Sequence, residues 1–140
     1  MNQDIKNSKC VIVVNGDLPT GLTVNAASVV SLTLGRSVPE LIGPDVKDAD
    51  GGVHLGITLI PVPVLTSSAE RIAQIHRLAV SDPEVVVVGF SDLAQSCRTY
   101  EEYMERMSGT APADLAYSSI GLFGPRKQLN KWTGSLALLR

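Results

Sequence analysis

Runs of apolar residues along the chain predict four β-strands. They lie at residues 9–15, 56–65, 84–90 and 115–123. The runs KCVIVVN (9–15) and EVVVVGF (84–90) are nearly continuous in β-branched residues, which is typical of strands buried on both faces. Pro61 and Pro63 stand two positions apart, so their missing N–H groups fall on one side of their strand. A central strand would not tolerate this gap, and we therefore predict an edge strand.

Helices are predicted between these strands. They cover residues 23–35, 67–80, 91–107 and 125–134. Thr23 is a candidate cap for the first helix and Gly35 a candidate end. Ser67 and Glu70 have the spacing of a capping box at the start of the second helix. Gly134 is placed to end the fourth.

The order of these elements predicts the class of fold. Strand and helix alternate throughout, which favours a three-layer α/β/α sandwich in a single domain over residues 9–140. Residues 1–8 are polar, and we expect a flexible N-terminus. Residues 38–54 are rich in glycine and acidic residues, so we expect a long loop.

Composition narrows the functional classes. With 140 residues, of which 44% are hydrophobic and 19% charged, the chain is globular. The net charge of -2 argues against a nucleic-acid partner. No apolar run is long enough to span a bilayer. Cys10 and Cys97 belong to no metal-ligand cluster, and we predict neither a metal nor a cofactor. No signal peptide is recognisable, which predicts a cytoplasmic protein.

The best candidate for a binding site follows the first strand. Asn15, Asp17, Thr23 and Asn25 surround its carboxyl end, where crevices form in open α/β sheets. Free N–H groups at the start of the next helix would suit an anionic ligand. The alternative is that Asp17 and Thr23 only cap the turn and the helix. The segment NGDLPTG matches neither dinucleotide-binding nor nucleoside triphosphate-binding loops.

The acidic segment DVKDADGGVH, residues 45–54, offers a second set of candidates. If it folds over the first crevice, Asp50 could orient His54 as a general base. The carboxylates could instead hold a divalent cation, or the segment could be a solvated loop. Ser91, which follows another strand, could contribute to the same rim or could cap a helix.

Two segments resemble a known enzyme family. Residues 13–28, VVNGDLPTGLTVNAAS, are similar to the strand, turn and helix of type II peptidyl-tRNA hydrolases, and residues 124–134, GPRKQLNKWTG, to their C-terminal motif. The chain also resembles, nearly end to end, an uncharacterised bacterial family that is catalogued as a domain of unknown function and thought to share that fold. The resemblance implies a mixed four-stranded sheet with one antiparallel strand, and a homodimer.

The departures from the hydrolase pattern bear on the chemistry. Val24 falls where the resemblance places the catalytic lysine, and Ser28 where it places a glutamine. Asn130 and Thr133 belong to the shared C-terminal motif and are further ligand-binding candidates, although Thr133 could simply end its helix. Valine can neither donate a proton nor stabilise an oxyanion, so the hydrolase reaction is not expected to proceed as in the family.

Two main functional hypotheses follow. The first is a protein that binds a small polar molecule in the crevice after the first strand, or a divergent hydrolase or transferase acting there. The second is a non-catalytic, dimeric interaction module that uses Trp132, or Tyr100 with Tyr103. Retained peptidyl-tRNA hydrolase activity is a third and weaker hypothesis.

Overall fold

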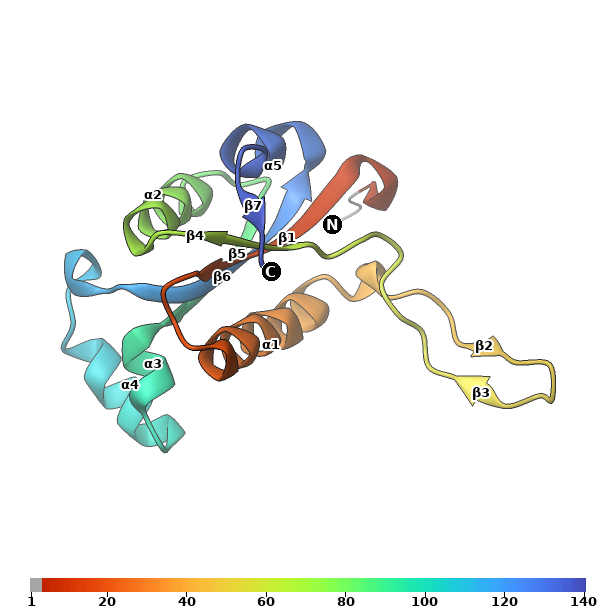
Figure 1. The fold of residues 1–140 in the computed structure, drawn as a ribbon, viewed down its shortest axis with the longest axis horizontal. Helices are drawn as coiled ribbons and strands as arrows, with labels where there is room; N and C mark the ends of the chain where they lie inside the picture. The colour runs from red at the N-terminus through yellow and green to blue at the C-terminus, as the bar shows by residue number, and fades with distance from the viewer. Residues whose placement is uncertain (1–3) are drawn as a thin grey trace.

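The computed structural model describes residues 4–140, whose main feature is one mixed β-sheet (Figure 1). The strands are β1 (Ser8–Asn15), β2 (Val46–Lys47), β3 (Val53–His54), β4 (Val64–Ser67), β5 (Val86–Ser91), β6 (Tyr117–Pro125) and β7 (Ala137–Leu138). The helices are α1 (Thr20–Ser37), α2 (Ala69–Val80), α3 (Asp92–Ser96), α4 (Tyr100–Ser108) and α5 (Arg126–Thr133). Three short 3-10 helices are η1 (Ile5–Asn7), η2 (Pro39–Leu41) and η3 (Pro112–Asp114). The fold is therefore mixed α/β.

The sheet has five strands in the order β5-β6-β1-β4-β7. β1 is parallel to β4 and antiparallel to β6, and β5 and β7 are each antiparallel to their single neighbour. The prediction of four strands missed β7, which pairs with β4 only through Leu65–Leu138 and Thr66–Ala137. A two-residue strand is too short to leave a periodic pattern in the sequence.

The strand that follows the proline pair is not at the edge of the sheet. β4 lies between β1 and β7, so the prediction from Pro61 and Pro63 was wrong. Both prolines precede the ladder, which begins at Val64. The carbonyl of Pro63 even accepts a hydrogen bond from the amide of Ile12 at 3.0 Å, because proline lacks only the donor. The two edges of the sheet are formed by β5 and by the much shorter β7.

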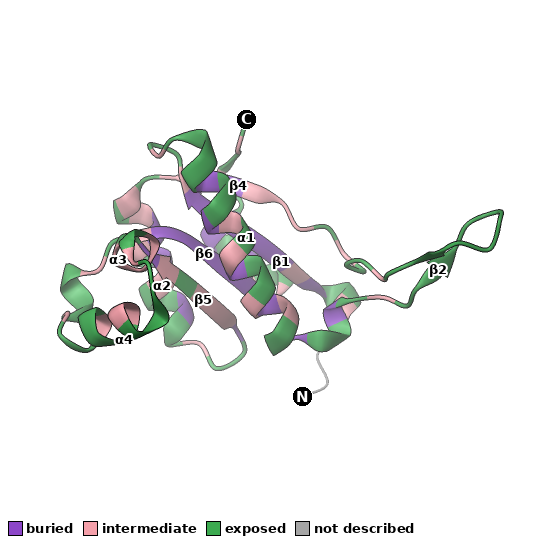
Figure 2. Ribbon diagram, turned by 90° about the horizontal axis from the view of Figure 1, so that it is seen from below, coloured by how far each residue is buried: buried purple, intermediate pink, exposed green. Residues whose placement is uncertain are grey.

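Each face of the sheet carries its own apolar core (Figure 2). α1 covers one face, whose core is made of Cys10, Ile12, Val14, Val30, Leu34, Val38, Leu41 and Phe123. α2 and α5 cover the other, whose core includes Val11, Val13, Ile72, Ile75, Ile120, Leu122, Leu129 and Trp132. Alternate residues of β1 enter opposite cores, as the strand period requires. Trp132 is thus a core anchor, and burial raises the pKa of the Cys10 thiol to about 11.

Several helix ends differ from the predictions. α1 begins at Thr20 after Pro19 and runs to Ser37, so Gly35 lies inside it. Thr23 does not cap this helix, because its buried hydroxyl donates to the carbonyl of Thr20. α2 is capped by Ser68, whose hydroxyl accepts from the amide of Arg71, while Ser67 is the last residue of β4. Sequence spacing alone did not distinguish the two adjacent serines.

The segment expected to be a long loop contains regular structure. It includes η2 and the β2–β3 hairpin, and the hairpin projects well away from the rest of the molecule (Figures 1 and 2). At the N-terminus, η1 precedes β1, which begins at Ser8, one residue earlier than predicted. Flexibility was predicted for residues 1–8, of which residues 1–3 lie outside the described part of the chain.

Candidate functional site

The polar residues after β1 are held together by hydrogen bonds within the chain. The side-chain oxygen of Asn15 accepts from the amide of Asp17 at 3.0 Å, which builds the turn. Gln95 of α3 donates to the side-chain oxygen of Asn25 at 3.2 Å and to the carbonyl of Leu22 at 3.0 Å. The structure therefore brings Asn25 to the start of α3, although Thr23 points into the protein.

The other predicted ligand-binding residues do not join this group. The hydroxyl of Ser28 donates to the carbonyl of Val24, and the buried hydroxyl of Thr133 donates to that of Leu129. Asn130 accepts a hydrogen bond from Lys9 Nζ at 2.6 Å, near the beginning of β1. Asn15 lies at the end of the same strand, so the two asparagines cannot bind one small ligand.

Ser91 caps α3. Its buried hydroxyl accepts from the amide of Ala94 at 3.1 Å. This matches the alternative that the sequence left open, and any further ligand-binding role of Ser91 stays a prediction.

The acidic segment does not fold over the crevice after β1. His54 lies on the projecting hairpin, and its Nε2 is 2.8 Å from the carboxylate of Asp48, not from Asp50. The same carboxylate of Asp48 accepts from the amides of Gly52 and Asp50. These contacts, first the one with His54, lower the pKa of Asp48. The expected His54–Asp50 pair is therefore absent, because Asp48 forms the turn and takes the histidine as well.

A hollow of about 480 Å³ lies on the α1 side of the edge strand. It is bounded by α1, by β5 and by the segment that links α3 to α4. Its lining residues are Val29, Thr33, Arg36, Val88, Gly89, Phe90, Ala94, Cys97, Arg98, Thr99, Tyr100 and Tyr103. We call this the arginine hollow.

Two guanidinium groups in the arginine hollow are uncommitted. Among residues 4–140, neither the Arg36 nor the Arg98 side chain forms an ion pair or a hydrogen bond. Tyr100 and Tyr103 form an aromatic wall, with ring centroids 5.4 Å apart and planes at 73°. The hollow thus combines positive charge with an apolar surface, which suits an organic anion.

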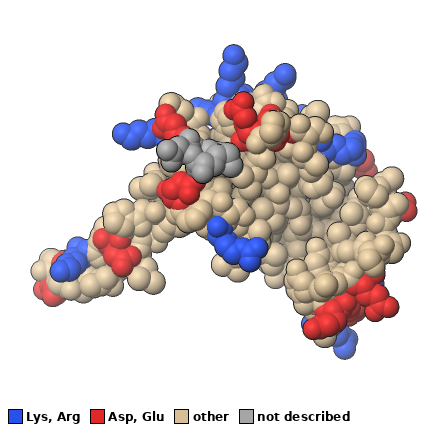
Figure 3. Space-filling view, turned by 180° about the vertical axis from the view of Figure 1, so that it is seen from behind, with Lys and Arg blue, Asp and Glu red and all other residues tan. Residues whose placement is uncertain are grey.

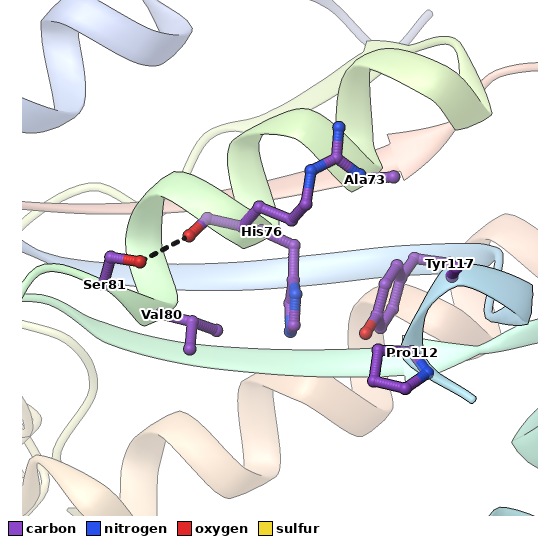
Figure 4. A pocket seen from close by; sticks show the side chains of 8 residues that line it. Ala73, His76, Val80, Ser81, Pro112 and Tyr117 are labelled. Atoms are coloured by element: carbon purple, nitrogen blue, oxygen red, sulfur yellow. Dashed lines mark hydrogen bonds between the residues drawn. The ribbon is translucent and has the colours of Figure 1, made fainter. Parts of the chain in front are cut away.

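A second hollow, of about 610 Å³, lies on the α2 side of the same edge strand (Figure 4). The rings of His76 and Tyr117 stack there, with centroids 4.3 Å apart and planes at 25°. Figure 4 shows both rings and Val80 pointing to the same side of α2, with Pro112 opposite. The Ser81 hydroxyl donates to the carbonyl of Arg77. The rings contact each other and the serine hydroxyl donates within the chain, so this hollow is lined by one arginine, Arg77, where the arginine hollow is lined by two.

The His76 ring should make stability depend on pH. Burial, and secondarily the charge of Arg77, lower the pKa of His76 below its usual 6.5. As pH falls through about 6.5, the unfolded chain takes up this proton before the folded chain does, so the free energy of unfolding decreases. Urea unfolding at about pH 7.5 and 5.5 should show a smaller decrease for His76→Gln than for wild type. Equal decreases would contradict the burial of this ring.

Residues 4–140 contain no group of three or more potential metal ligands, and no helix among them is long and apolar enough to cross a membrane. The arginine hollow could not be predicted from the sequence. Arg36 and Arg98 are far apart in the chain and belong to no motif. Tyr100 and Tyr103 were predicted only as part of an interaction surface.

Comparison with known proteins identifies the family. Residues 8–140 match the family described as "Protein of unknown function (DUF2000)", and the chain belongs to it. A solved structure of a protein of unknown function from Agrobacterium tumefaciens strain C58 is similar, with a TM-score of 0.84 and 17% sequence identity. The match covers 94% of this chain and 97% of that one, and at this identity it shows a shared fold alone. No curated protein matches.

Proposed function

We propose that the protein binds a small organic anion with an apolar body in the arginine hollow. The observation that carries the proposal is the pair of uncommitted guanidinium groups, Arg36 and Arg98, beside a tyrosine wall. The chain as a whole has a net charge of -2, yet this hollow is lined by two arginines and by no acidic residue. A carboxylate or phosphate would find charged donors there, and the tyrosines would contact the rest of the ligand.

The dimensions of the hollow support a small molecule. Its volume of about 480 Å³ falls in the range of ordinary ligand pockets. Both arginines are exposed, so each contact with an anion is weakened by water and salt, and we expect modest affinity.

The chemistry of the hollow favours binding over catalysis. Its one thiol, Cys97, donates to the carbonyl of Leu93 at 3.2 Å, and no histidine lines the hollow to act as its base. The hydroxyl of Thr99 accepts from the amide of Glu102 and caps α4. An activated nucleophile commonly needs a neighbouring general base, and the lining residues of the hollow supply none.

We further propose that the scaffold is the three-layer sandwich of the type II peptidyl-tRNA hydrolases with its reaction lost. Helices on both faces of the sheet support the first part. For the second, Val24 occupies the position of the catalytic lysine and is 56% exposed. The chain's lysines lie elsewhere, with Lys6 and Lys9 by the start of β1, Lys47 on the hairpin, and Lys127 and Lys131 on α5.

Calorimetric titration tests the binding proposal. Phenyl phosphate combines the required charge with an apolar ring, and we expect it to bind at least about tenfold more tightly than neutral benzyl alcohol. Arg36→Gln and Arg98→Gln should each weaken phenyl phosphate about tenfold, the effect expected for one charge-assisted contact. The matched control is Arg77→Gln, which removes an arginine from the other hollow.

The results would separate the alternatives clearly. Unchanged affinity in Arg77→Gln with losses in the other two variants places the anion in the arginine hollow. If phenyl phosphate gives no saturable heat, or if the Arg36 and Arg98 variants bind it as wild type does, the proposal is wrong.

A further inference from the structure

The projecting hairpin and its flanks, residues 42–59, expose an unusual concentration of large apolar side chains. We call this segment the arm. Of the fourteen large hydrophobic residues that are exposed within residues 4–140, six belong to it: Ile42 (43% exposed), Val46 (59%), Val53 (61%), Leu55 (78%), Ile57 (79%) and Leu59 (56%). The other eight are spread over the remaining chain. Large apolar side chains that are exposed together in one segment often mark a contact with another molecule.

The arm has a definite backbone shape. β2 and β3 pair through Val46–His54 and Lys47–Val53. At the base, the amide of Gly43 donates to the carbonyl of Ile57 at 2.8 Å, and that of Leu59 donates to Leu41 at 2.9 Å. These contacts fix the course of the chain without covering its apolar side chains.

An arm of this construction should not be stable when surrounded by water. Two-stranded hairpins alone are marginal in water, and burial of the exposed leucine and isoleucine side chains would stabilise this one. Figures 1 and 2 show the arm extending away from the body in both views, so its own body does not cover it. A second molecule that covered these side chains would stabilise the arm.

We propose that the arm packs against a second copy of this chain in a reciprocal, two-fold dimer. In such an assembly each copy gives its arm and receives its partner's, so both apolar surfaces are buried by one symmetric contact. This inference is independent of the anion site, because the arm contributes no residue to the arginine hollow.

Charge indicates where the arm binds on the partner. The arm contains Asp45, Asp48 and Asp50 against the single Lys47, a net charge of -2 with His54 neutral. α5 carries Arg126, Lys127 and Lys131 and no acidic residue, a charge of +3. Among residues 4–140, none of these three cations forms an ion pair. The acidic tip of one copy therefore complements α5 of the other.

The surface next to α5 offers apolar contacts as well. A hollow of about 220 Å³ is lined there by Ile60, Pro61 and Pro63 together with Lys9, Arg126 and two polar residues. Figure 3 shows basic side chains along the upper side of the molecule, where α5 lies in Figure 1, and mixed charges on the arm. This side of the molecule therefore offers basic side chains for the acidic tip of the arm and apolar side chains for its stem.

Sedimentation velocity on the full chain tests the arm. We expect wild type to be dimeric at micromolar concentration and Leu55→Ser/Ile57→Ser to be monomeric. The matched control is Leu32→Ser, since Leu32 on α1 is also 78% exposed. It should leave the dimer intact. Circular dichroism establishes that each variant is folded. A monomeric wild type, or a dimer that survives the double substitution in the arm, would overturn the proposal.

Charge reversal tests the position of the arm on the partner. Ala49→Lys/Asp50→Lys reverses the tip without touching Asp48, which forms the turn. Lys127→Glu/Lys131→Glu reverses α5. Each pair of substitutions should raise the dimer dissociation constant at least about tenfold. The variant that combines both pairs should regain most of the lost affinity. Failure of the combination to recover would refute α5 as the receiving surface, even if the arm were still required.

Discussion

Replacing Phe123 by alanine is expected to lower the free energy of unfolding by about 3–5 kcal/mol. Phe123 is fully buried in β6, opposite Cys10 of β1 and Val86 of β5, in the core that α1 covers. The loss combines the transfer of an aromatic ring to water with the cavity that it leaves. Single domains are stable by only about 5–15 kcal/mol, so a large part of the total would be lost. Urea unfolding of both chains measures the difference.

Tyr100→Ala provides the comparison. It also removes an aromatic ring, but Tyr100 is 69% exposed, and its main aromatic contact is with Tyr103. We expect a cost below about 1 kcal/mol. If Phe123→Ala were equally mild, the core on the α1 face could not be packed as the structure has it.

A second large effect is expected from Gly121→Val. A Cβ at this position in β6 would lie 2.7 Å from Cδ1 of Leu34 and 3.3 Å from Cβ of Val30, both on α1. The absent side chain lets α1 approach the middle of the sheet closely. Because Leu34 and Val30 are fully enclosed, valine should force α1 outward and cost about 1–3 kcal/mol.

Gly35→Ala is the control for this substitution. Gly35 lies within α1 itself, and a Cβ there would meet nothing within 4 Å. Alanine should therefore stabilise the helix, by about 0.5–1 kcal/mol. Leu34→Ala provides a further test, since in the Gly121→Val chain it should cost less than it does alone. Additive effects would show that the two side chains do not compete for space.

The candidate site was only partly accessible from the sequence. The pattern located the turn after β1, where the side chain of Asn15 accepts from the amide of Asp17. It could not determine that Asn25 would be joined to Gln95 of α3, or that Thr23 would be buried. The prediction for His54 failed for a similar reason. Asp48 and Asp50 have the same local chemistry, and only the turn geometry shows that Asp48 faces the imidazole.

The arginine hollow could not be predicted because its two arginines are far apart in the sequence. Arg36 ends α1 and Arg98 precedes α4, and each alone resembles any surface arginine. They line one hollow because the sheet order places β5 at an edge, with α1 and α4 on either side of that hollow.

The sequence by itself determined the class of fold. The valine runs, the alternation of strand and helix, and the turn residues all act between near neighbours, so a local pattern records them. The same pattern did not show that only the run in β1 would be buried on both faces, because β5 lies at the edge of the sheet and is mostly half-buried. Only the tertiary structure decided the fifth strand, the projection of the arm, and which charged and aromatic groups share a cavity. These features depend on strand order and on contacts between residues remote in the chain, and no short stretch of sequence contains that information.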